Sequence, residues 1–290
     1  MIESIVQQGQ PQTCVRPDVA EAIAQLLQLG EKQSDLRPAV RLQIEVLRAI
    51  YALPVTVYAV SLTTKAIVTR SSTGTPLLHN MALPIDSAQL RALFQHLAAV
   101  AYQHERAQCV VNLDPLALAH MLLSGDRQAL VDRVQASGCS PEPIITLLRL
   151  ALLPFLEQVT EQLTPLRTSP EVQRRAPWQH GYCPTCGAWP LLATVQGQEQ
   201  QRYLHCGMCT TTWPVERVWC PFCGTRDHTQ LGYLQVEDTP QSMAVCNACH
   251  SYLKVQKTLR RLTTPQLLVA EVASMHLDLI ARDHGYALPG

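Results

Sequence analysis

Apolar residues recur every three to four positions along much of the first 170 residues, and this period is typical of amphipathic helices. Between residues 86 and 108, for example, Leu90, Leu93, Leu97 and Val100 fall on one helical face. A stripe of this kind must be covered by other helices. The pattern therefore predicts a compact all-α domain rather than isolated helices.

Local signals mark where several of these helices begin and end. A capping residue followed by proline stands at 114–115 and again at 140–141, each before a helical stretch, and proline fits the first helical position. Gly30 and Gly125 stand where helices are predicted to stop. We assign residues 1–170 to the helical domain.

The most apolar stretch, residues 143–157, contains Arg149 and Pro154. It is shorter than the roughly 20 residues that a membrane span requires, so we predict a buried helix and no membrane span. The N-terminus lacks the basic start and apolar core of a secretory signal. We therefore expect the protein to stay in the cytoplasm.

Two segments break the helical pattern. Residues 55–78 are rich first in β-branched residues and then in turn formers, and we interpret them as an irregular insertion. Residues 164–178 contain three prolines and few apolar side chains, which is typical of a linker.

Beyond residue 171 the pattern changes to short alternating stretches such as QRYLH and SMAV, which predict short strands and tight turns. A helical pattern returns after residue 263, with Thr264 as the cap and Pro265 at the first position, and this helix should pack back on the body of the protein. Its apolar face comprises Leu268, Val272, Met275 and Leu279.

Composition narrows the class of protein. The chain has 290 residues, of which 47% are hydrophobic, and its 23 basic residues balance its 23 acidic ones. This supports a real hydrophobic core, and it gives no long-range field that would attract nucleic acid or anionic lipid.

Cysteine supplies the candidate chemistry. Eight of the 11 cysteines form four Cys-x-x-Cys pairs, which read CPTCG at 183–187, HCGMC at 205–209, CPFCG at 220–224 and VCNAC at 245–249. The first and third pairs share a proline and a trailing glycine that the second and fourth lack. The remaining three cysteines, Cys14, Cys109 and Cys139, are interpreted as small buried hydrophobic residues.

Loop lengths indicate how the pairs combine. The first two pairs enclose nineteen residues (187–205) and the last two enclose twenty-two (224–245), whereas only ten (210–219) separate the second pair from the third. Sequential pairing makes two similar ribbons, while crossed pairing would need unlike loops. We predict ribbons over 171–215 and 216–262, followed by a C-terminal helix over 263–290.

This spacing is that of a tetrahedral site with four thiolate ligands. Proline after the first cysteine restricts the turn, and glycine after the second permits a positive φ. A redox dithiol would need one pair in a βαβ context, which is missing here, and disulfides are disfavoured in a reducing cytoplasm. Zinc and a single iron fit four soft ligands about equally well, so the metal stays open.

Nothing else in the sequence indicates catalysis. It contains no phosphate-binding glycine loop and no Gly-x-Ser-x-Gly motif, and two fully ligated metals leave no position for water or substrate. We therefore predict a protein that is not an enzyme. Four histidines adjoin the cysteine pairs and are interpreted as surface residues or as residues beside the sites: His180, His205, His228 and His250.

Zinc ribbons often bind nucleic acid, so that function is the main alternative. Trp189, Trp213 and Trp219 could stack on bases. However, the ribbons carry only a small excess of basic residues, and tryptophans more often pack on a metal ribbon. A third alternative is an enzyme that uses the free thiols of the isolated cysteines.

The stretches GYCPTCGAWP, RYLHCGMCTTTW, VWCPFCG and CNACHSYLK, in this order and followed by a short helix that ends in RDHGY, resemble the FdhE family of formate dehydrogenase accessory proteins. The resemblance covers residues 178–290. Over residues 1–170 it extends only to the general helical character.

The resemblance implies a cytoplasmic, non-catalytic maturation factor that binds the molybdenum-containing catalytic subunit of respiratory formate dehydrogenase before export. It also implies rubredoxin-like sites that carry iron, with zinc as the alternative, and it leaves self-association open. Tyr203, Arg217, Tyr252 and Lys254 match recurring family positions. The implied ligands are Cys183, Cys186, Cys206 and Cys209 for one site, and Cys220, Cys223, Cys246 and Cys249 for the other.

Overall fold

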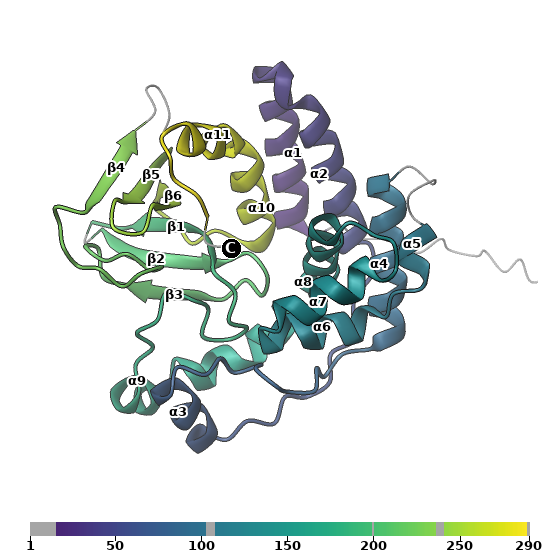
Figure 1. Cartoon of the computed structure of the whole chain (residues 1–290), viewed down its shortest axis with the longest axis horizontal. Helices are drawn as coiled ribbons and strands as arrows, with labels where there is room; N and C mark the ends of the chain where they lie inside the picture. Colours follow the sequence, from purple (N-terminus) through teal and green to yellow (C-terminus); the bar gives the residue numbers. More distant parts are fainter. Residues whose placement is uncertain (1–15, 103–107, 199, 236–240, 289–290) are drawn as a thin grey trace, which may run out of the picture.

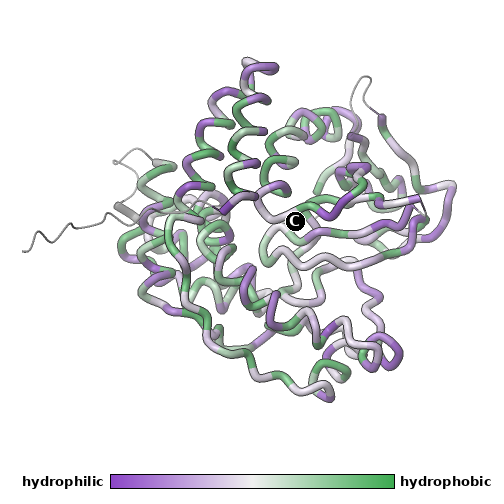
Figure 2. Tube along the Cα trace, turned by 180° about the vertical axis from the view of Figure 1, so that it is seen from behind, coloured by the Kyte–Doolittle hydropathy of each residue, from purple (hydrophilic) through white to green (hydrophobic). Residues whose placement is uncertain are grey.

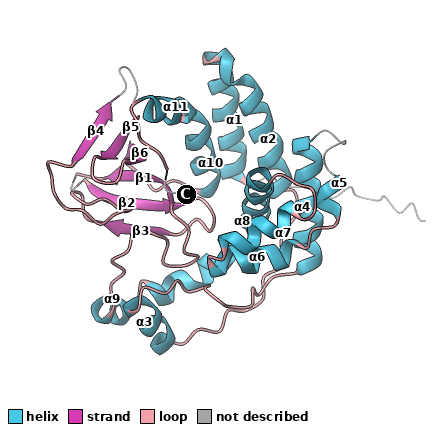
Figure 3. Cartoon of the chain, viewed as in Figure 1, coloured by secondary structure: helices cyan, strands magenta, loops and turns pink. Residues whose placement is uncertain are grey.

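The computed structural model describes residues 16–102, 108–198, 200–235 and 241–288. Within them the chain forms a body of helices and, beside it, one six-stranded sheet, with the last two helices between the sheet and the first two helices (Figure 1). The strands gather on one side of the molecule and most helices on the other, as Figure 3 shows. The predicted fold class is confirmed: an all-α N-terminal part is followed by a small β part that carries two four-cysteine groups, and by C-terminal helices.

The helices of the body are α1 (Pro17–Lys32), the 3-10 turn η1 (Ser34–Leu36), α2 (Arg37–Ile50), α3 (Thr64–Ser72), α4 (Ser87–Tyr102), α5 (Gln108–Val111), α6 (Pro115–Ser124), α7 (Arg127–Gln135), α8 (Pro141–Arg167) and α9 (Pro170–Arg175). The strands are β1 (Pro190–Gln196), β2 (Gln201–Cys206), β3 (Thr212–Val215), β4 (Leu231–Gln235), β5 (Gln241–Cys246) and β6 (Ser251–Thr258). The chain then forms α10 (Thr264–Ala273) and α11 (Met275–Asp283).

Helix α8 runs through the core of the helical body. Along most of the described helices, hydrophobic positions alternate with hydrophilic ones (Figure 2), whereas α8 is buried over long stretches on several sides. By length and composition it is the single helix among the described residues that could cross a membrane, but 72% of its most apolar window is buried inside the protein. The core helix of a folded body meets the same criteria, so length and composition alone do not indicate a span.

The end of α8 differs from the prediction. A linker was expected from residue 164, yet α8 continues to Arg167 with Pro165 inside it, and α9 begins at Pro170 after the cap Ser169. Helix capping by the Ser169 side chain, which accepts a hydrogen bond from the N–H of Val172, explains why a proline-rich stretch can still form a helix.

The boundary signals were right in part. Asp114 caps α6, and Gly125 ends it in the left-handed conformation with φ of 76°. Gly30, expected to stop a helix, lies buried inside α1 instead. A Cβ atom at Gly30 would stand 3.4 Å from a methyl group of Val40 on α2, so glycine serves close packing of the two helices there.

The C-terminal pattern was expected to form one helix, and it forms two. Ser274 is the C-cap of α10, and its hydroxyl donates to the carbonyl of Ala270 at 2.6 Å. Met275 and Leu279 then lie on the surface, 42% and 62% exposed, instead of continuing the apolar face. The cap is Thr263, one residue earlier than expected, and it forms a capping box with Gln266.

The six strands are ordered β3-β2-β1-β6-β5-β4. The first ribbon contributes three antiparallel strands, the second contributes the other three, and β1 joins β6 in parallel through Ala193↔Val255 and its neighbours. The two ribbons are therefore repeats placed side by side in one continuous sheet.

Of the three isolated cysteines, Cys139 can be placed with its side chain, in the helical body. Cys139 is 7% exposed, in line with the expected burial, but it is disulfide-bonded rather than a free thiol. Cys14 and the side chain of Cys109 lie outside the described residues.

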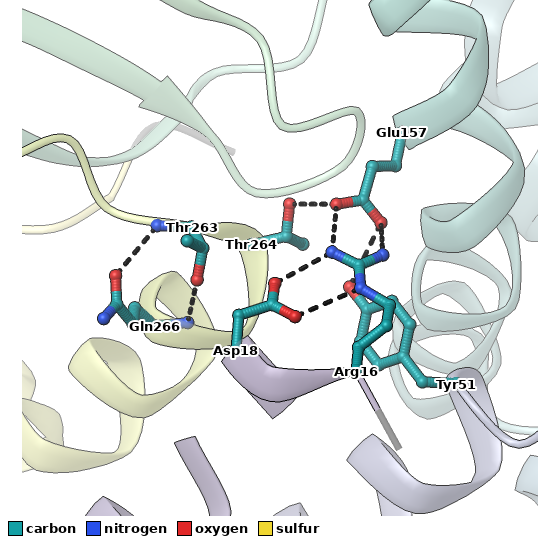
Figure 4. Close-up of polar contacts among 7 residues, drawn as sticks. All are labelled: Arg16, Asp18, Tyr51, Glu157, Thr263, Thr264 and Gln266. Carbon is teal, nitrogen blue, oxygen red and sulfur yellow. Dashed lines mark hydrogen bonds and ion pairs between the residues drawn. The ribbon is translucent and has the colours of Figure 1, made fainter. Parts of the chain in front are cut away.

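A buried carboxylate connects the first, middle and last parts of the chain (Figure 4). Glu157 of α8 accepts hydrogen bonds from Arg16 at 3.3 and 3.4 Å, from the Tyr51 hydroxyl at 3.3 Å and from the Thr264 hydroxyl at 2.9 Å. Arg16 also lies 4.8 Å from the centre of the Tyr51 ring and pairs with Asp18. Burial of the Tyr51 hydroxyl, followed by the charge of Glu157, raises its pKa, so the tyrosine stays a donor.

Replacing this carboxylate should loosen α10 from the helical body. We expect Glu157→Gln to lower the free energy of unfolding by about 2 kcal/mol, because charge-assisted hydrogen bonds to a buried acceptor are lost. Urea denaturation followed by circular dichroism measures the change. The matched control is Glu161→Gln, one turn later on the exposed side of α8, and equal stability of the two variants would contradict the proposed role of Glu157.

Candidate metal centres

The structure brings the eight paired cysteines together in two groups of four. Within each group all four sulfurs lie within 4.8 Å of one another. We call Cys183, Cys186, Cys206 and Cys209 the inner site, and Cys220, Cys223, Cys246 and Cys249 the outer site. The first pair joins the second and the third joins the fourth, which is the sequential arrangement expected from the loop lengths.

The spacing of the sulfurs fits a tetrahedral metal ion. Sulfur atoms approach to 3.4 Å in the inner site, between Cys183 and Cys209 and between Cys186 and Cys206. In the outer site the sulfurs of Cys220 and Cys249, and those of Cys223 and Cys246, are 3.7 Å apart. Metal–sulfur bonds of about 2.3 Å in a tetrahedron place sulfurs about 3.8 Å apart. Both groups are thus close to the geometry that zinc or iron would require.

The turns that carry the sulfurs have the backbone expected from their sequence. In the first pair the N–H of Gly187 donates to the carbonyl of Cys183 at 2.9 Å, and Gly187 has φ of 82°. Gly224 has φ of 78° in the third pair. Thr210 and His250 occupy the same place in the other two pairs and also have positive φ, 63° and 53°. All four turns are therefore alike, and those without glycine carry backbone strain of about 1 kcal/mol each.

Polar groups already surround the inner sulfurs. The N–H of Thr185 donates to Cys183 Sγ, and those of Met208 and Cys209 donate to Cys206 Sγ, all at 3.4 Å. Thr211 lies 3.1 Å from Cys209 Sγ and donates to the Thr185 hydroxyl. Such donors stabilise thiolates and orient them toward an ion.

Burial makes the inner site dependent on a cation. It raises the pKa of Cys186 and Cys206 well above the usual range. Burial acts in the same direction on Cys209, but hydrogen bonds from the other three thiols and from Thr211 outweigh it and hold its pKa well below that range. Buried thiols with opposed protonation preferences cannot ionise together without positive charge among them, and a divalent or trivalent metal ion would supply it.

The helical body holds the inner site from two sides. Thr160 of α8 donates to the carbonyl of Cys209 at 2.8 Å. The N–H groups of Leu77 and Leu78 donate to the carbonyls of Pro184 and Thr185, at 2.9 and 2.8 Å. One continuous hydrophobic core includes the inner cysteines and the helices.

The segment around Leu77 was missed as part of the site. Residues 55–78 were interpreted as an irregular insertion, yet 64–72 form α3 and the following turn packs on the first cysteine pair. Tyr182 donates to the carbonyl of Gly74 at 2.7 Å, and Pro76 stands close to Gly187. The turn formers TGTP were the available signal, since they mark a tight turn but do not indicate its partner.

The outer site is closer to solvent. Cys223 is exposed and Cys249 is half-buried, whereas all four inner cysteines are buried. Contact between the sites passes through Gly181, where a Cβ atom would stand only 1.7 Å from the carbonyl oxygen of Pro221. Glycine is therefore required next to the first pair for the third pair to pack against it.

The histidines beside the pairs have different environments. His205 is fully buried between the hydroxyls of Thr194 and Thr212, at 2.8 and 3.1 Å. Burial, and then the charge of Arg261, lowers its pKa to about 4, so the ring is neutral. His228 and His250 are exposed. None of the four histidines belongs to the two sulfur groups found among the described residues.

Four further residues were noted in the sequence because they match recurring positions of the FdhE family. Two of them connect the sheet to the last helices. Tyr252 donates to Asp278 at 2.7 Å, and the buried Lys254 pairs with Glu271 at 2.7 Å and with Asp278 at 3.2 Å. Tyr203 lies in β2, and Arg217 lies exposed between the ribbons.

A buried arginine accompanies each site. Arg167, 7% exposed, donates to the carbonyl of Thr212 at 3.2 Å, and Cys183 and Cys209 act on its charge. Arg202, 2% exposed, donates to the carbonyl of Trp219 at 3.0 Å, next to Cys220. Burial lowers the pKa of both guanidinium groups. Cys183 and Cys209 oppose this shift for Arg167, and Tyr233 followed by Cys220 opposes it for Arg202. Sequence analysis gave no signal for either residue.

Comparison with known proteins shows which proteins this chain is similar to. Residues 182–217 match the family model described as FdhE, central domain. "Protein FdhE homolog" of Stutzerimonas stutzeri is 36% identical over 109 residues, and "Protein FdhE" of Escherichia coli (strain K12 / DH10B) is 35% identical over 115 residues. These alignments cover 36% and 38% of this chain, and 35% and 36% of those relatives. The chain thus matches about a third of the length of either relative.

Other comparisons extend over more of the chain. "Protein FdhE homolog" of Aquifex aeolicus is 26% identical over 234 residues, which are 79% of this chain and 77% of that protein. The crystal structure of the FdhE protein from Pseudomonas aeruginosa has a TM-score of 0.63 and 21% sequence identity, and covers 97% of this chain and 95% of that one. The latter likeness concerns the fold.

The difference in exposure should separate the two sites kinetically. With metal bound, we expect a chromogenic chelator to remove one equivalent quickly from the outer site and the second slowly, because the inner site is buried in the core. Cys223→Ser should eliminate the fast phase, and the matched Cys186→Ser should eliminate the slow phase. Release of both equivalents in one phase would contradict this assignment.

Proposed function

With FdhE as the family that the comparisons support for this chain, we propose that the protein is a non-enzymatic accessory factor in formate dehydrogenase maturation, which binds the catalytic subunit in the cytoplasm before export. The observation that carries the proposal is the match of residues 182–217 to the FdhE central domain, since these residues hold all four cysteines of the inner site. We also propose that the eight cysteines of the two sites are metal ligands.

The architecture supports a binding role. In the two groups identified among the described residues, four sulfurs can saturate each ion, so neither metal would keep a position for substrate. The inner site ties the helices to the sheet, while the outer site places Cys223 at the surface. A scaffold of this kind can present a rigid surface to a folding partner.

Nucleic-acid binding is less well supported. Trp213 and Trp219, two of the three tryptophans considered for base stacking, are only 1% and 8% exposed. A buried indole cannot stack on a base. Exposed Arg226 is paired with Glu216 at 2.8 Å, which reduces the basic surface further.

Capture experiments test the proposed partner. We expect tagged protein to retain the catalytic subunit from cells that make respiratory formate dehydrogenase, and Cys183→Ser and Cys220→Ser to lose most of it, because metal-free ribbons fold poorly. His228→Ser, an exposed residue of the outer ribbon, is the control and should retain the subunit. Failure of the wild-type protein to capture it would refute the partner, even if both metal sites are real.

Absorption of the purified protein distinguishes iron from zinc. A thiolate-to-iron charge-transfer band in the visible range is expected if both sites hold iron, as the family resemblance implies. Colourless protein that contains two equivalents of zinc would refute the iron assignment and leave the four-thiolate geometry intact. Metal analysis on the same sample supplies the stoichiometry.

A further inference from the structure

A small pocket lies between the two ribbons, beside the outer site. Its lining includes Arg202, Arg217, Trp219, Cys220 and Tyr233. Two of these residues are basic, and no acidic residue lines the pocket among the residues that the structure describes. The pocket is therefore a recess with mostly apolar walls and two basic side chains.

Arg202 forms the buried part of the recess, and its hydrogen bonding is incomplete. Only Nη1 has a partner, the carbonyl of Trp219 at 3.0 Å. Nε and Nη2 are fully buried and have no hydrogen-bond partner within the described part of the chain. Buried charged groups are normally paired, because an unpaired donor loses its hydration without compensation.

The two free nitrogens define what would satisfy them. Nε and Nη2 lie on the same edge of the planar guanidinium, so their N–H groups point outward in parallel. Two parallel donors match the two oxygens of a carboxylate, and this bidentate pairing is the strongest that arginine forms. A single carbonyl or water oxygen would satisfy one of them only.

We propose that this recess is a carboxylate-binding site, in which the free edge of Arg202 holds both oxygens and Arg217 closes the mouth. Arg217 is exposed and makes no hydrogen bond or ion pair with another described residue, so it is available to an incoming anion. This proposal does not rest on the function proposed above.

The size of the recess selects a small group. The volume open to water inside the recess is about 30 Å³. One water molecule needs about 10–15 Å³ of such volume. Two ordered waters, or the carboxylate that would replace them, fill such a space. A nucleotide or a bulky organic acid does not fit unless only its carboxylate enters.

The neighbouring thiols do not take the place of this ligand. Cys220 and Cys246 line the same recess, and Cys220 acts on the charge of Arg202 over a distance. No hydrogen bond joins Nε or Nη2 of Arg202 to either sulfur. The two unpartnered nitrogens of Arg202, a residue that lines the recess, are thus not satisfied by the metal ligands.

Calorimetric titration of the metal-loaded full chain with sodium acetate and sodium formate tests the proposal, with sodium chloride at equal ionic strength as the reference. We expect saturable binding of one carboxylate per chain that chloride does not reproduce. Arg202→Met should weaken it more than about tenfold, and Arg217→Ala about two- to fivefold. Arg260→Ala changes an exposed arginine of the second ribbon outside the pocket and should leave carboxylate binding unchanged.

Arg202→Lys separates the paired donors from the charge. The lysine keeps a positive charge but lacks the two parallel N–H donors, so this variant should bind carboxylate almost as weakly as Arg202→Met. Each variant is compared only after it has been shown to hold two metal equivalents. If Arg202→Met does not fold, the loss of carboxylate affinity in Arg217→Ala tests the proposal in its place. Heats equal to those of chloride, or unchanged affinity in both Arg217→Ala and a folded Arg202 variant, would overturn the proposal.

A peptide that carries one glutamate between neutral residues identifies the source of the carboxylate. If it displaces acetate and binds more tightly, the natural ligand is an acidic side chain of a partner. If it does not compete while acetate and formate bind, the ligand is a free small acid. Both outcomes support the recess as a carboxylate site, and they separate its two natural sources.

Discussion

Four buried sulfurs at the junction of helices and sheet are the constraint on which the rest of the structure depends. The inner cysteines belong to the same hydrophobic core as the helical body, and backbone groups of Leu77, Leu78 and Thr160 bind the turns that carry them. Thiolates in such surroundings require a cation. Metal binding at the inner site would therefore stabilise the contact between helices and sheet, and not the ribbon alone.

The second ribbon is attached to this junction indirectly. It joins the first through the parallel β1–β6 pairing and through the contact of Gly181 with Pro221, while Tyr252 and Lys254 connect it to α11 and α10. Glu157 returns α10 to the helical body. The outer site thus lies on a firmly held scaffold but is itself open at Cys223. Repeats that are similar in sequence have come to occupy different environments, one in the core and one at the surface.

Much of the site could be predicted because its signals are local. The spacing of the pairs, the loop lengths between them and the glycines with positive φ all act within one ribbon. Contacts made over long sequence separations escaped prediction. The attachment of residues 73–78 to the first pair uses backbone groups, which any sequence can supply. Gly30 packs against a later helix, α2. In the sequence Glu157 is a single polar residue in an apolar stretch, and only the fold places its partners at residues 16, 51 and 264 beside it.

The buried arginines suggest how the two sites differ in charge. Four thiolates around a divalent ion carry a net charge of −2, and around a trivalent ion −1, so one guanidinium offsets part of either charge. Arg167 is enclosed with the inner site. Arg202 faces the outer site but has a free edge toward the pocket. If a carboxylate binds there, it competes with the outer thiolates for the same positive charge. By reciprocity, a change in the charge of the outer metal site must then alter carboxylate affinity, and the carboxylate must alter the energetics of that site by the same amount.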